Sequence, residues 1–388
     1  MKAPLSTIVP ALLLATASLP ALAETGVSGD AVRLGMVNVQ SGPAAALGTG
    51  MLAGASAVFD DVNARGGVHG RRIDLRVADD GYEPEQAIDQ TLAMIEEEEV
   101  FSLFGFVGTP TANAVLPIVD ELEVPLVGLF TGAGTLRTPV TREVFNVRSS
   151  YDDEAEAMVA HFLADGAKNV AVFYQDDGFG KAVLSGTTKA LARRGMDVYA
   201  KGTFQRNTMA VKGGLAAMLE AEPDAIVMVG TYAPLAEFVK SAREAGLRSR
   251  MATVSFVGTT NLVEAVGKAG DGVLITQVMP YPYDDRLPVV EDCRGLLKAH
   301  GGGALDYVNL EGCVSAKVMV EGLERAGREL TREGLIEAFE AMDAYDLGGI
   351  TIGYAADDHQ GMDRIFVSEI RDGGVVQLDG ETRVSESD

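Results

Sequence analysis

Residues able to perform bond chemistry are few among the 388 residues of this chain, and none occurs in a catalytic pattern. The four histidines are His69, His161, His300 and His359, and no H-E-x-x-H motif includes any of them. Neither the G-x-S-x-G nucleophile turn nor the G-x-x-x-x-G-K-[ST] phosphate loop occurs. A glycine-rich stretch at 48–54 is one residue too long for a dinucleotide loop. We therefore expect solvent-exposed histidines, no catalytic residues, no metal, no cofactor and no enzyme.

Four small polar turns are the clearest sign of a binding site, because each follows a stretch that predicts a buried strand. The turns are Gln40-Ser41-Gly42-Pro43, Gly108-Thr109-Pro110-Thr111, Phe130-Thr131-Gly132-Ala133-Gly134 and Gly230-Thr231-Tyr232-Ala233. At the carboxyl edge of a parallel sheet, free backbone amides and helix N-termini attract anionic groups. The sequence therefore predicts a site for a small carboxylate that needs no counter-cation.

Thr109 is the sharpest candidate, because it precedes a predicted helix that runs to Leu122. The amides in the first turn of such a helix have no partner within the helix. One interpretation is that these amides and the Thr109 hydroxyl hold a ligand carboxylate. The other is that the hydroxyl only caps the helix. The sequence leaves both interpretations open.

The elements that position these turns are short β-branched runs alternating with amphipathic helices. The alternation begins at Val32 and restarts after Ser150. Three successive helices at 288–299, 307–326 and 331–342 are expected to return to the first block. This order predicts an α/β fold in two blocks, each a parallel sheet covered by helices on both faces.

Charge and the N-terminus restrict the compartment and the partners. The chain has 32 Lys and Arg against 56 Asp and Glu, a formal net charge of −24, which disfavours nucleic acids and anionic membranes as partners. Residues 1–23 combine a positive Lys2, an apolar stretch and an A-x-A site, which predicts a signal peptide cleaved after Ala23. A retained membrane anchor is the alternative, but the stretch is short and contains two prolines. We expect an exported chain with no membrane insertion after cleavage.

The two cysteines, Cys293 and Cys313, are both on predicted helices. An oxidising compartment permits a disulfide between them, which would clamp two consecutive helices. Two separate buried thiols are the alternative. No His or third Cys stands at metal-ligand spacing, so no zinc site is expected.

Several short motifs occur in the order and spacing of a known family. They are Ser41-Gly42-Pro43, Asn63-Ala64-Arg65-Gly66-Gly67-Val68-His69-Gly70, Asp79-Asp80 before Pro84, Asp176 with Phe179-Gly180, and Ala242-Arg243-Glu244-Ala245-Gly246-Leu247. Over roughly residues 30–345 the chain resembles the periplasmic solute-binding proteins of branched-chain amino acid ABC transporters. The resemblance implies two Rossmann-like lobes with parallel sheets, which close over a ligand and are joined by three crossover segments near 146–150, 276–282 and 344–349.

The resemblance also implies domain boundaries and an output. Lobe 1 is expected to comprise 24–147 and 280–346, and lobe 2 to comprise 148–279 and 347–388. We expect a periplasmic, monomeric protein that delivers a small carboxylate-bearing ligand, a branched-chain or other amino acid, to a membrane ABC permease. Signalling to a receptor or sensor kinase is the alternative output, and an exported enzyme is the third class.

The family's ligand-binding positions can be carried over to this chain. In relatives, a Ser/Thr loop that matches Thr109 and a second loop that matches 131–133 hold the ligand carboxylate, and aromatics that match Phe179 and Tyr232 line the cleft. Leu47 stands where relatives have an aromatic. The predicted ligand-binding residues are Gln40, Ser41, Leu47, Thr109, Pro110, Thr111, Thr131, Gly132, Ala133, Phe179, Thr231, Tyr232, Ser255 and Phe256.

One departure from the family concerns the ligand's ammonium group. Relatives that bind α-amino acids offer a Glu to it, whereas the corresponding loop here, 254–258, reads Val-Ser-Phe-Val-Gly and contains no acid. A buried ammonium without a partner is costly. Asp176, Asp177 or Glu311 could substitute, and a carboxylic acid without an amino group is the alternative ligand.

Overall fold

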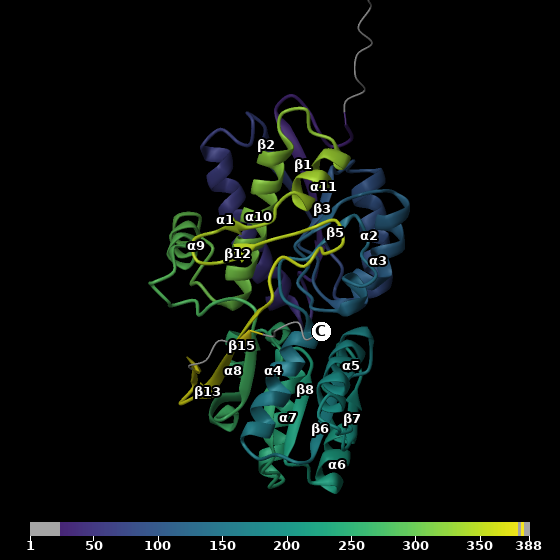
Figure 1. Ribbon diagram of the computed structural model, residues 1–388, viewed down its shortest axis with the longest axis vertical. Coiled ribbons are helices and arrows are strands. Elements are labelled where there is room, and N and C mark those ends of the chain that lie inside the picture. The colour runs from purple at the N-terminus through teal and green to yellow at the C-terminus, as the bar shows by residue number, and fades with distance from the viewer. Residues whose placement is uncertain (1–23, 379–381, 384–388) are drawn as a thin grey trace, which may run out of the picture.

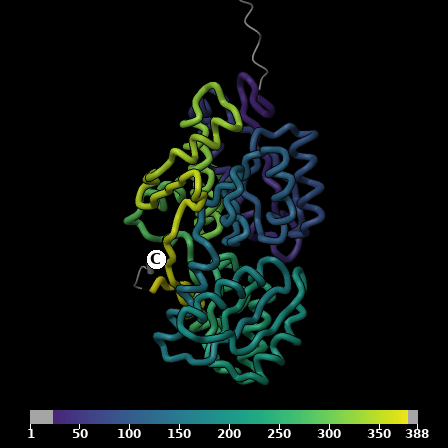
Figure 2. Tube along the Cα trace, turned by 45° about the vertical axis from the view of Figure 1, so that its right-hand side comes forward, coloured from purple at the N-terminus to yellow at the C-terminus, as the bar shows by residue number. Residues whose placement is uncertain are grey.

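The computed structural model describes residues 24–378 and 382–383, which form two lobes, each with a β-sheet at its centre (Figure 1). Figure 2 shows the same two lobes after a turn of 45°. The predicted α/β fold with parallel sheets is confirmed. The predicted signal peptide, residues 1–23, lies outside the described residues.

The first lobe has a sheet of five parallel strands in the order β2-β1-β3-β4-β5. The strands are β1 (Ala31–Asn38), β2 (Arg72–Asp79), β3 (Ser102–Phe104), β4 (Leu126–Val127) and β5 (Val144–Phe145). Every residue of β3, β4 and β5 is buried. Burial on both faces explains why these strands read as continuous apolar runs rather than as alternating patterns.

The second lobe has a sheet in the order β14-β13-β10-β9-β8-β6-β7, and β15 also pairs with β13. The strands are β6 (Val170–Gln175), β7 (Lys201–Phe204), β8 (Ala225–Val229), β9 (Arg250–Thr253), β10 (Leu274–Gln277), β13 (Arg364–Arg371), β14 (Gly374–Gln377) and β15 (Thr382–Arg383). Strands β6 to β10 are parallel, whereas β13 and β14 are antiparallel additions from the end of the chain.

Helices cover both sheets (Figure 1). Those that follow strands of the first sheet are α1 (Ala45–Ala64), α2 (Pro84–Glu96) and α3 (Thr109–Glu121). Those interleaved with the second sheet are α4 (Tyr151–Ala164), α5 (Gly178–Ala192), α6 (Lys212–Ala221), α7 (Tyr232–Glu244) and α8 (Thr259–Val266). The three later helices are α9 (Pro288–Ala299), α10 (Tyr307–Ala326) and α11 (Arg332–Glu340).

Helix α10 returns to the first lobe and packs along α1 at very short range. A Cβ placed on Gly54 would lie 2.0 Å from the Asn309 carbonyl oxygen, and one on Gly312 would lie 2.3 Å from that of Met51. Only glycine permits this approach. A disulfide joins Cys293 of α9 to Cys313 of α10, which confirms the pairing expected from the sequence.

Three connections pass between the lobes. Two run from β5 to α4 and from β10 to α9. The third was expected at 344–349, but those residues belong to a hairpin of β11 (Tyr345–Asp346) and β12 (Thr351–Ile352), and the chain reaches β13 only through 353–363. Ile352 and Tyr354 pack in the core of the first lobe. The residue-level domain boundaries stay a prediction.

Candidate ligand-binding site

Loops that follow the carboxyl ends of strands in both lobes contact one another, and this contact defines the candidate site. The ring of Phe130, after β4, lies 5.4 Å from that of Phe256, after β9. Tyr82, after β2, lies 6.2 Å from the same Phe256 ring. The carboxyl edges of the two sheets therefore face each other, as expected for ligand sites in open α/β sheets.

Two buried threonines of the first lobe face each other in this space. The Oγ1 atoms of Thr109 and Thr131 are 2.6 Å apart, and Thr131 also lies 3.4 Å from the Tyr151 hydroxyl. Helix α3 begins at Thr109 itself, and its cap residue is Gly108, which has a φ of 104°. A Cβ on Gly108 would lie 2.2 Å from the Tyr82 ring, so this position requires glycine.

The Thr109 hydroxyl makes no capping hydrogen bond. The interpretation of Thr109 as a helix cap is therefore wrong. Because its hydroxyl points to Thr131 and its own amide lies in the first turn of α3, Thr109 stands where an anionic group would meet unpaired amides.

The loop 131–133 is held in place by Arg137 and Tyr151. The Arg137 guanidinium donates to the carbonyl oxygens of Ala133, at 3.0 Å, and of Arg148, at 2.9 Å. The Tyr151 amide donates to the Gly132 carbonyl at 2.7 Å. Burial lowers the pKa of Arg137 to about 10, which leaves it charged at neutral pH. These contacts fix the position of the loop's backbone amides and of the Thr131 hydroxyl.

Five aromatic rings from both lobes pack against one another beside the two threonines. They are Tyr82, Phe130, Tyr151, Phe179 and Phe256. The Phe179 ring lies 4.6 Å from that of Phe256 and 5.4 Å from that of Tyr151. All five are buried. Burial raises the pKa of the Tyr151 hydroxyl to about 12, so it remains a neutral donor. The site is therefore lined mainly by apolar surface, which suits an apolar ligand side chain.

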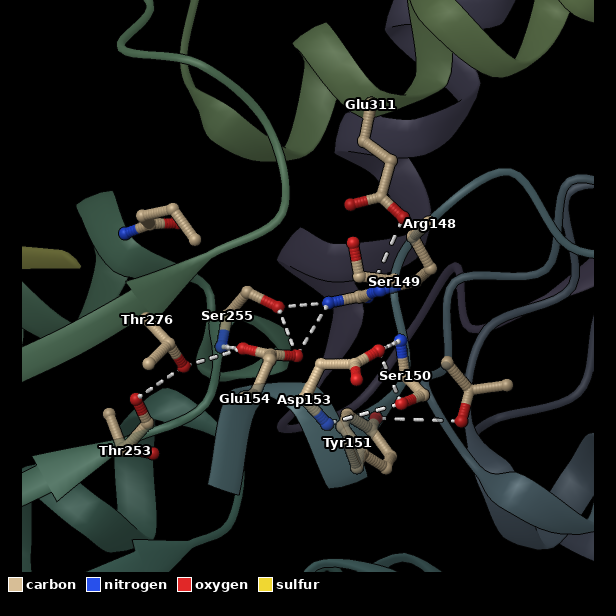
Figure 3. Close-up of polar contacts among 12 residues, drawn as sticks. Arg148, Ser149, Ser150, Tyr151, Asp153, Glu154, Thr253, Ser255, Thr276 and Glu311 are labelled. Atoms are coloured by element: carbon tan, nitrogen blue, oxygen red, sulfur yellow. Dashed lines mark hydrogen bonds and ion pairs between the residues drawn. The ribbon is translucent and has the colours of Figure 1, made fainter. Parts of the chain in front are cut away.

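A buried charged cluster lies beside these rings, and we call Arg148, Glu154, Ser255, Thr276 and Glu311 the central cluster (Figure 3). Arg148 is fully buried on the connection between β5 and α4. Its guanidinium carbon lies 4.8 Å from the Phe130 ring centroid, and its Nη2 contacts both Ser255 Oγ and Glu154. Arg148 Nε and Nη1 make no hydrogen bond. The guanidinium therefore retains unused donors at the boundary between the lobes.

Glu154 has the opposite character, because donors surround its carboxylate. The Ser255 amide donates at 2.7 Å, the Ser255 hydroxyl at 3.0 Å and the Thr276 hydroxyl at 2.6 Å. Arg148 Nη2 lies 3.4 Å away. Burial raises the pKa of Glu154, but this set of donors and the Arg148 charge favour the carboxylate form.

Glu311 reaches toward Arg148 from α10 of the first lobe (Figure 3). Glu311 is 3% exposed, and its Oε1 lies 3.5 Å from Arg148 Nη1. Burial, opposed by Arg148 and reinforced by Glu154, raises the pKa of Glu311 to about 7. Glu311, Phe130 and Ser255 border a gap between the lobes that has no space for a water molecule. The lobes are thus closed upon each other here.

A second polar contact between the lobes lies at the edge of the boundary, and we call Glu83, Asp177, Arg206 and Asn207 the rim cluster. Arg206, after β7, lies 2.7 Å from Glu83 Oε2 and 3.3 Å from Asp177 Oδ2. Asn207 Nδ2 donates to Glu83 Oε1 at 2.7 Å. The side chains of Glu83 and Arg206 are 42% and 21% exposed. The rim cluster thus joins the lobes near solvent.

The structure gathers part of the predicted set at the site and places the rest elsewhere. Residues of the set with side chains or backbone at the boundary described above are Thr109, Thr131, Gly132, Ala133, Phe179, Ser255 and Phe256. Pro110 is buried beside Thr109, and Thr231 is buried before α7. Leu47 and Tyr232 both lie close to Gly258, since a Cβ on that glycine would lie 2.8 Å from Leu47 and 3.3 Å from Tyr232.

Three residues of the set are engaged in other contacts. The backbone amides of Gln40 and Ser41 donate to Asp79 Oδ1, at 2.8 and 3.3 Å, and Ser41 is exposed. The Thr111 hydroxyl donates to the Val107 carbonyl at 2.7 Å. The assignment of the whole set to a ligand stays a prediction.

The sequence analysis missed the residues that fill the middle of the site. Arg148 lies within the predicted crossover at 146–150, and Tyr151 and Glu154 lie in the first turn of the helix that follows. An Arg flanked by apolar residues and small polar ones was the available signal. The expectation of solvent-exposed histidines is wrong for His359, which is 2% exposed, stacks 4.0 Å from Phe145 and contacts the Val144 carbonyl.

Within the described ranges there is no group of His, Cys, Asp or Glu that could hold a metal ion. In that same part of the chain no helix is long and apolar enough to cross a membrane.

Comparison with known proteins places this arrangement in a family. The family model described as "Periplasmic binding protein" matches residues 31–374. A solved structure of a possible leucine/isoleucine/valine-binding protein from Rhodopirellula baltica SH 1 has 32% identity and a TM-score of 0.86, with coverage of 90% of this chain and 96% of that one. These matches span nearly the whole described chain.

Two further similarities concern proteins with stated ligands. The leucine-, isoleucine-, valine-, threonine- and alanine-binding protein of Pseudomonas aeruginosa is 21% identical over 85% of this chain and 87% of its own length. A branched-chain amino acid ABC transporter protein from Thermus thermophilus with bound valine has 18% identity and a TM-score of 0.83, covering 94% and 98% of the two chains. At that identity the solved structure supports the fold alone.

Proposed function

The chain belongs to the periplasmic binding protein family, and on that premise we propose that it is an exported solute-binding protein that captures a small carboxylate-bearing molecule between its lobes. We further propose an amino acid with an apolar side chain as the ligand and delivery to a membrane ABC permease. The convergence of the Thr109–Thr131 pair with the aromatic rings of both lobes supports the proposal most directly. The family and its relatives are substrate-binding proteins, not enzymes.

In this proposal the ligand carboxylate meets Thr109, Thr131 and the amides at the start of α3. Helix N-terminal amides are suited to anions because they point outward unpaired and carry the positive end of the helix dipole. The apolar side chain then packs on Phe179 and Phe256 of the second lobe. Because the ligand touches both lobes only when they are together, it stabilises the closed state by its differential affinity.

A carboxylic acid without an amino group is the second candidate ligand. The loop 254–258 reads Val-Ser-Phe-Val-Gly and offers no acid to a ligand's ammonium group. Phe256 lies among the aromatic rings, so this loop adds apolar surface rather than charge.

A thermal-shift screen tests the proposed function. The mature protein is unfolded and refolded to remove carried ligand, then heated with L-leucine, L-valine, L-alanine or L-phenylalanine, and with 4-methylpentanoate, 3-methylbutanoate, propanoate or 3-phenylpropanoate. A compound at about 100 times its Kd adds about 2.7 kcal/mol to the free energy of unfolding, which raises Tm by several degrees. If no compound of either class shifts Tm, the proposed function fails.

A matched pair of variants in α3 shows whether binding uses the predicted site. Thr109→Val removes the hydroxyl that faces Thr131, whereas Thr111→Val removes one that is bonded within its own helix. We expect the ligand-induced shift to be lost in Thr109→Val and kept in Thr111→Val. Equal loss in both variants would place the effect in the fold of α3 rather than at the ligand.

A further inference from the structure

Tyr82 has an unusual backbone conformation for a residue with a large side chain. It lies in the turn between β2 and α2, and its φ is 62°. This left-handed region is costly for any residue that carries a Cβ. Such a conformation persists only where the surrounding contacts enforce it, and residues of this kind gather at functional sites. The contacts of Tyr82 therefore indicate what its conformation is for.

Two adjacent acids hold the turn in this conformation. Asp79 Oδ1 accepts a hydrogen bond from the Gly81 amide at 2.9 Å. Asp80 Oδ1 accepts one from the Tyr82 amide at 2.8 Å, and the Asp80 carbonyl accepts one from the Glu83 amide at 2.9 Å. The Asp79-Asp80 motif of the sequence thus fixes the direction in which the Tyr82 side chain leaves the first lobe.

The Tyr82 side chain contacts residues at or after the carboxyl ends of three strands of the second sheet. Its hydroxyl accepts a hydrogen bond at 3.3 Å from Nε2 of Gln175, the last residue of β6. Its ring lies 6.2 Å from the Phe256 ring, after β9, and 6.0 Å from the Arg206 guanidinium carbon, after β7. Tyr82 is 1% exposed. Each of these contacts joins the two lobes, so each is lost when the lobes separate.

The same ring lies against the start of α3. A Cβ on Gly108, the cap residue of α3, would lie 2.2 Å from Tyr82 Cε2. The next residue is Thr109, whose hydroxyl faces Thr131. Tyr82 thus touches both the helix start proposed to bind a carboxylate and the lobe that closes over it.

We propose that Tyr82 is a positioning residue for closure, which holds the second lobe over a ligand at the start of α3 and slows the release of that ligand. This inference rests on the proposed function. The ligand enters while the lobes are apart, when Tyr82 makes none of its contacts with the second lobe. After closure, Gln175, Arg206 and Phe256 must separate from Tyr82 before the ligand leaves. An attraction present only in the closed state lowers the dissociation rate and leaves the association rate nearly unchanged.

A residue that only filled the core of the first lobe would behave differently. Its loss would lower the stability of the protein without any compound and would alter association and dissociation together. Tyr82→Gly separates these cases, because glycine adopts a φ of 62° without cost and keeps the turn while the ring is removed. Tyr82→Phe keeps the ring and removes only the hydroxyl that contacts Gln175.

The matched control is Tyr354→Phe. Tyr354 is a second buried tyrosine, 4% exposed in the core of the first lobe. Within the described ranges its hydroxyl makes no hydrogen bond. Both variants remove one buried phenol hydroxyl, so any difference between them reports the contact that Tyr82 makes with the second lobe.

A double-mutant cycle with Gln175→Leu tests that contact itself. Gln175 Nε2 also donates to Asp177 at 2.6 Å, so Gln175→Leu alone removes two bonds. The cycle cancels the second bond, because it is lost with or without the Tyr82 hydroxyl. If that hydroxyl acts through Gln175, Tyr82→Phe should change the dissociation rate much less in Gln175→Leu than in the unchanged protein.

Surface plasmon resonance on refolded protein measures association and dissociation rates for the four amino acids and four des-amino acids of the thermal-shift screen. For compounds that bind, Tyr82→Gly should dissociate about 30-fold faster, since two ring contacts and a hydrogen bond are lost. Tyr82→Phe should dissociate about 2- to 10-fold faster. Association rates should stay within about twofold, and Tyr354→Phe should match the unchanged protein. Urea unfolding without compound measures the stability of each variant.

Small-angle X-ray scattering of the refolded protein without compound provides a test that does not depend on the ligand. Because Tyr82 joins the lobes through Gln175, Arg206 and Phe256, Tyr82→Gly should shift the protein toward separated lobes. We therefore expect a larger radius of gyration for Tyr82→Gly and an unchanged one for Tyr354→Phe.

Three results would overturn the inference. Unchanged dissociation rates in both Tyr82 variants would show that Tyr82 does not hold the closed state. A loss of stability with equal changes in association and dissociation would leave Tyr82 with a structural role only. An unchanged radius of gyration in Tyr82→Gly would also overturn it. If no compound binds the unchanged protein, the proposed function fails, whereas the scattering result still decides the role of Tyr82 in closure, so the two failures are distinguishable.

Discussion

The two polar clusters that join the lobes differ in how their charges are satisfied. In the rim cluster, Arg206 lies between two acids that are partly exposed or bonded to backbone, and Asn207 completes the contact with Glu83. In the central cluster, Arg148 and Glu311 are almost completely buried yet leave donors and acceptors unused. Water and dissolved ions screen the charges of the rim cluster, whereas the buried charges of the central cluster are not screened in this way.

This difference indicates separate roles for the two clusters. Exposed ion pairs between lobes contribute little energy each and can break when the lobes open. Buried charges with unused bonding capacity are expensive, and a binding site is one place where such a cost is offset by a partner. We infer that the rim cluster helps to stabilise the closed state and that the central cluster contacts the ligand. The following substitutions separate these roles.

The largest expected effect is on stability and comes from Glu154→Ala in the central cluster. This substitution removes the fully bonded partner of Arg148 and leaves the Ser255 amide and the Thr276 hydroxyl without their acceptor. We expect the free energy of unfolding to fall by about 3–5 kcal/mol. Glu83→Ala in the rim cluster should cost about 1 kcal/mol or less. Urea unfolding of both variants measures the difference, and similar losses would contradict the distinction between the clusters.

A smaller effect is expected in the pH dependence of stability. The pKa of Glu311 is raised from 4.5 to about 7, so the folded protein holds a proton that the unfolded chain releases. The free energy of unfolding should therefore decrease as pH rises through this window. The charged groups that face Glu311 are Arg148 and Arg137, which oppose the shift, and Glu154, which adds to it.

Glu311→Gln removes this proton, so it should flatten the pH profile. We expect the variant to exceed the unchanged protein by about 1–3 kcal/mol at pH 8 and to lose that advantage near pH 4.5. Urea unfolding at pH 4.5, 6 and 8 without ligand measures the profile. A difference that does not change with pH would show that Glu311 is ionised throughout and that its charge is already compensated.

The same contrast explains what the sequence could and could not predict. The alternation of strands and helices, with apolar runs such as those at β3 and β8, is a local pattern, and it predicted the α/β fold correctly. The pairing of Cys293 with Cys313, which was expected from their positions on successive predicted helices, was also confirmed. The third connection differed from expectation because the hairpin of β11 and β12 depends on packing against the first lobe.

The centre of the candidate site depends on contacts between residues that are distant in sequence. Arg148 contacts Glu311, which lies 163 positions later in the sequence (311 − 148), and no local periodicity predicts such a contact. Gly108 and Thr109 were recognisable from the turn that precedes α3, but only the structure shows that the Thr109 hydroxyl contacts Thr131 and does not cap the helix. Local motifs thus indicate which loops reach the boundary, whereas burial and charge balance identify which side chains meet there.

The smallest expected effect comes from Arg206→Ala in the rim cluster, and it concerns closure rather than stability. Arg206 contacts Glu83 of the first lobe and lies 6.0 Å from the Tyr82 ring, so its loss removes attraction present only when the lobes are together. An exposed pair contributes up to about 1 kcal/mol, which corresponds to an affinity loss of about fivefold or less. Because salt screens exposed charges, that loss should shrink between 50 mM and 500 mM NaCl.

Arg193→Ala, which removes an ion pair with Glu156 inside the second lobe, is the control and should leave affinity unchanged. Titration calorimetry with the compound that gives the largest thermal shift measures both variants. A loss for Arg206→Ala that is large and independent of salt would make the rim cluster part of the ligand site and remove the contrast between the two clusters.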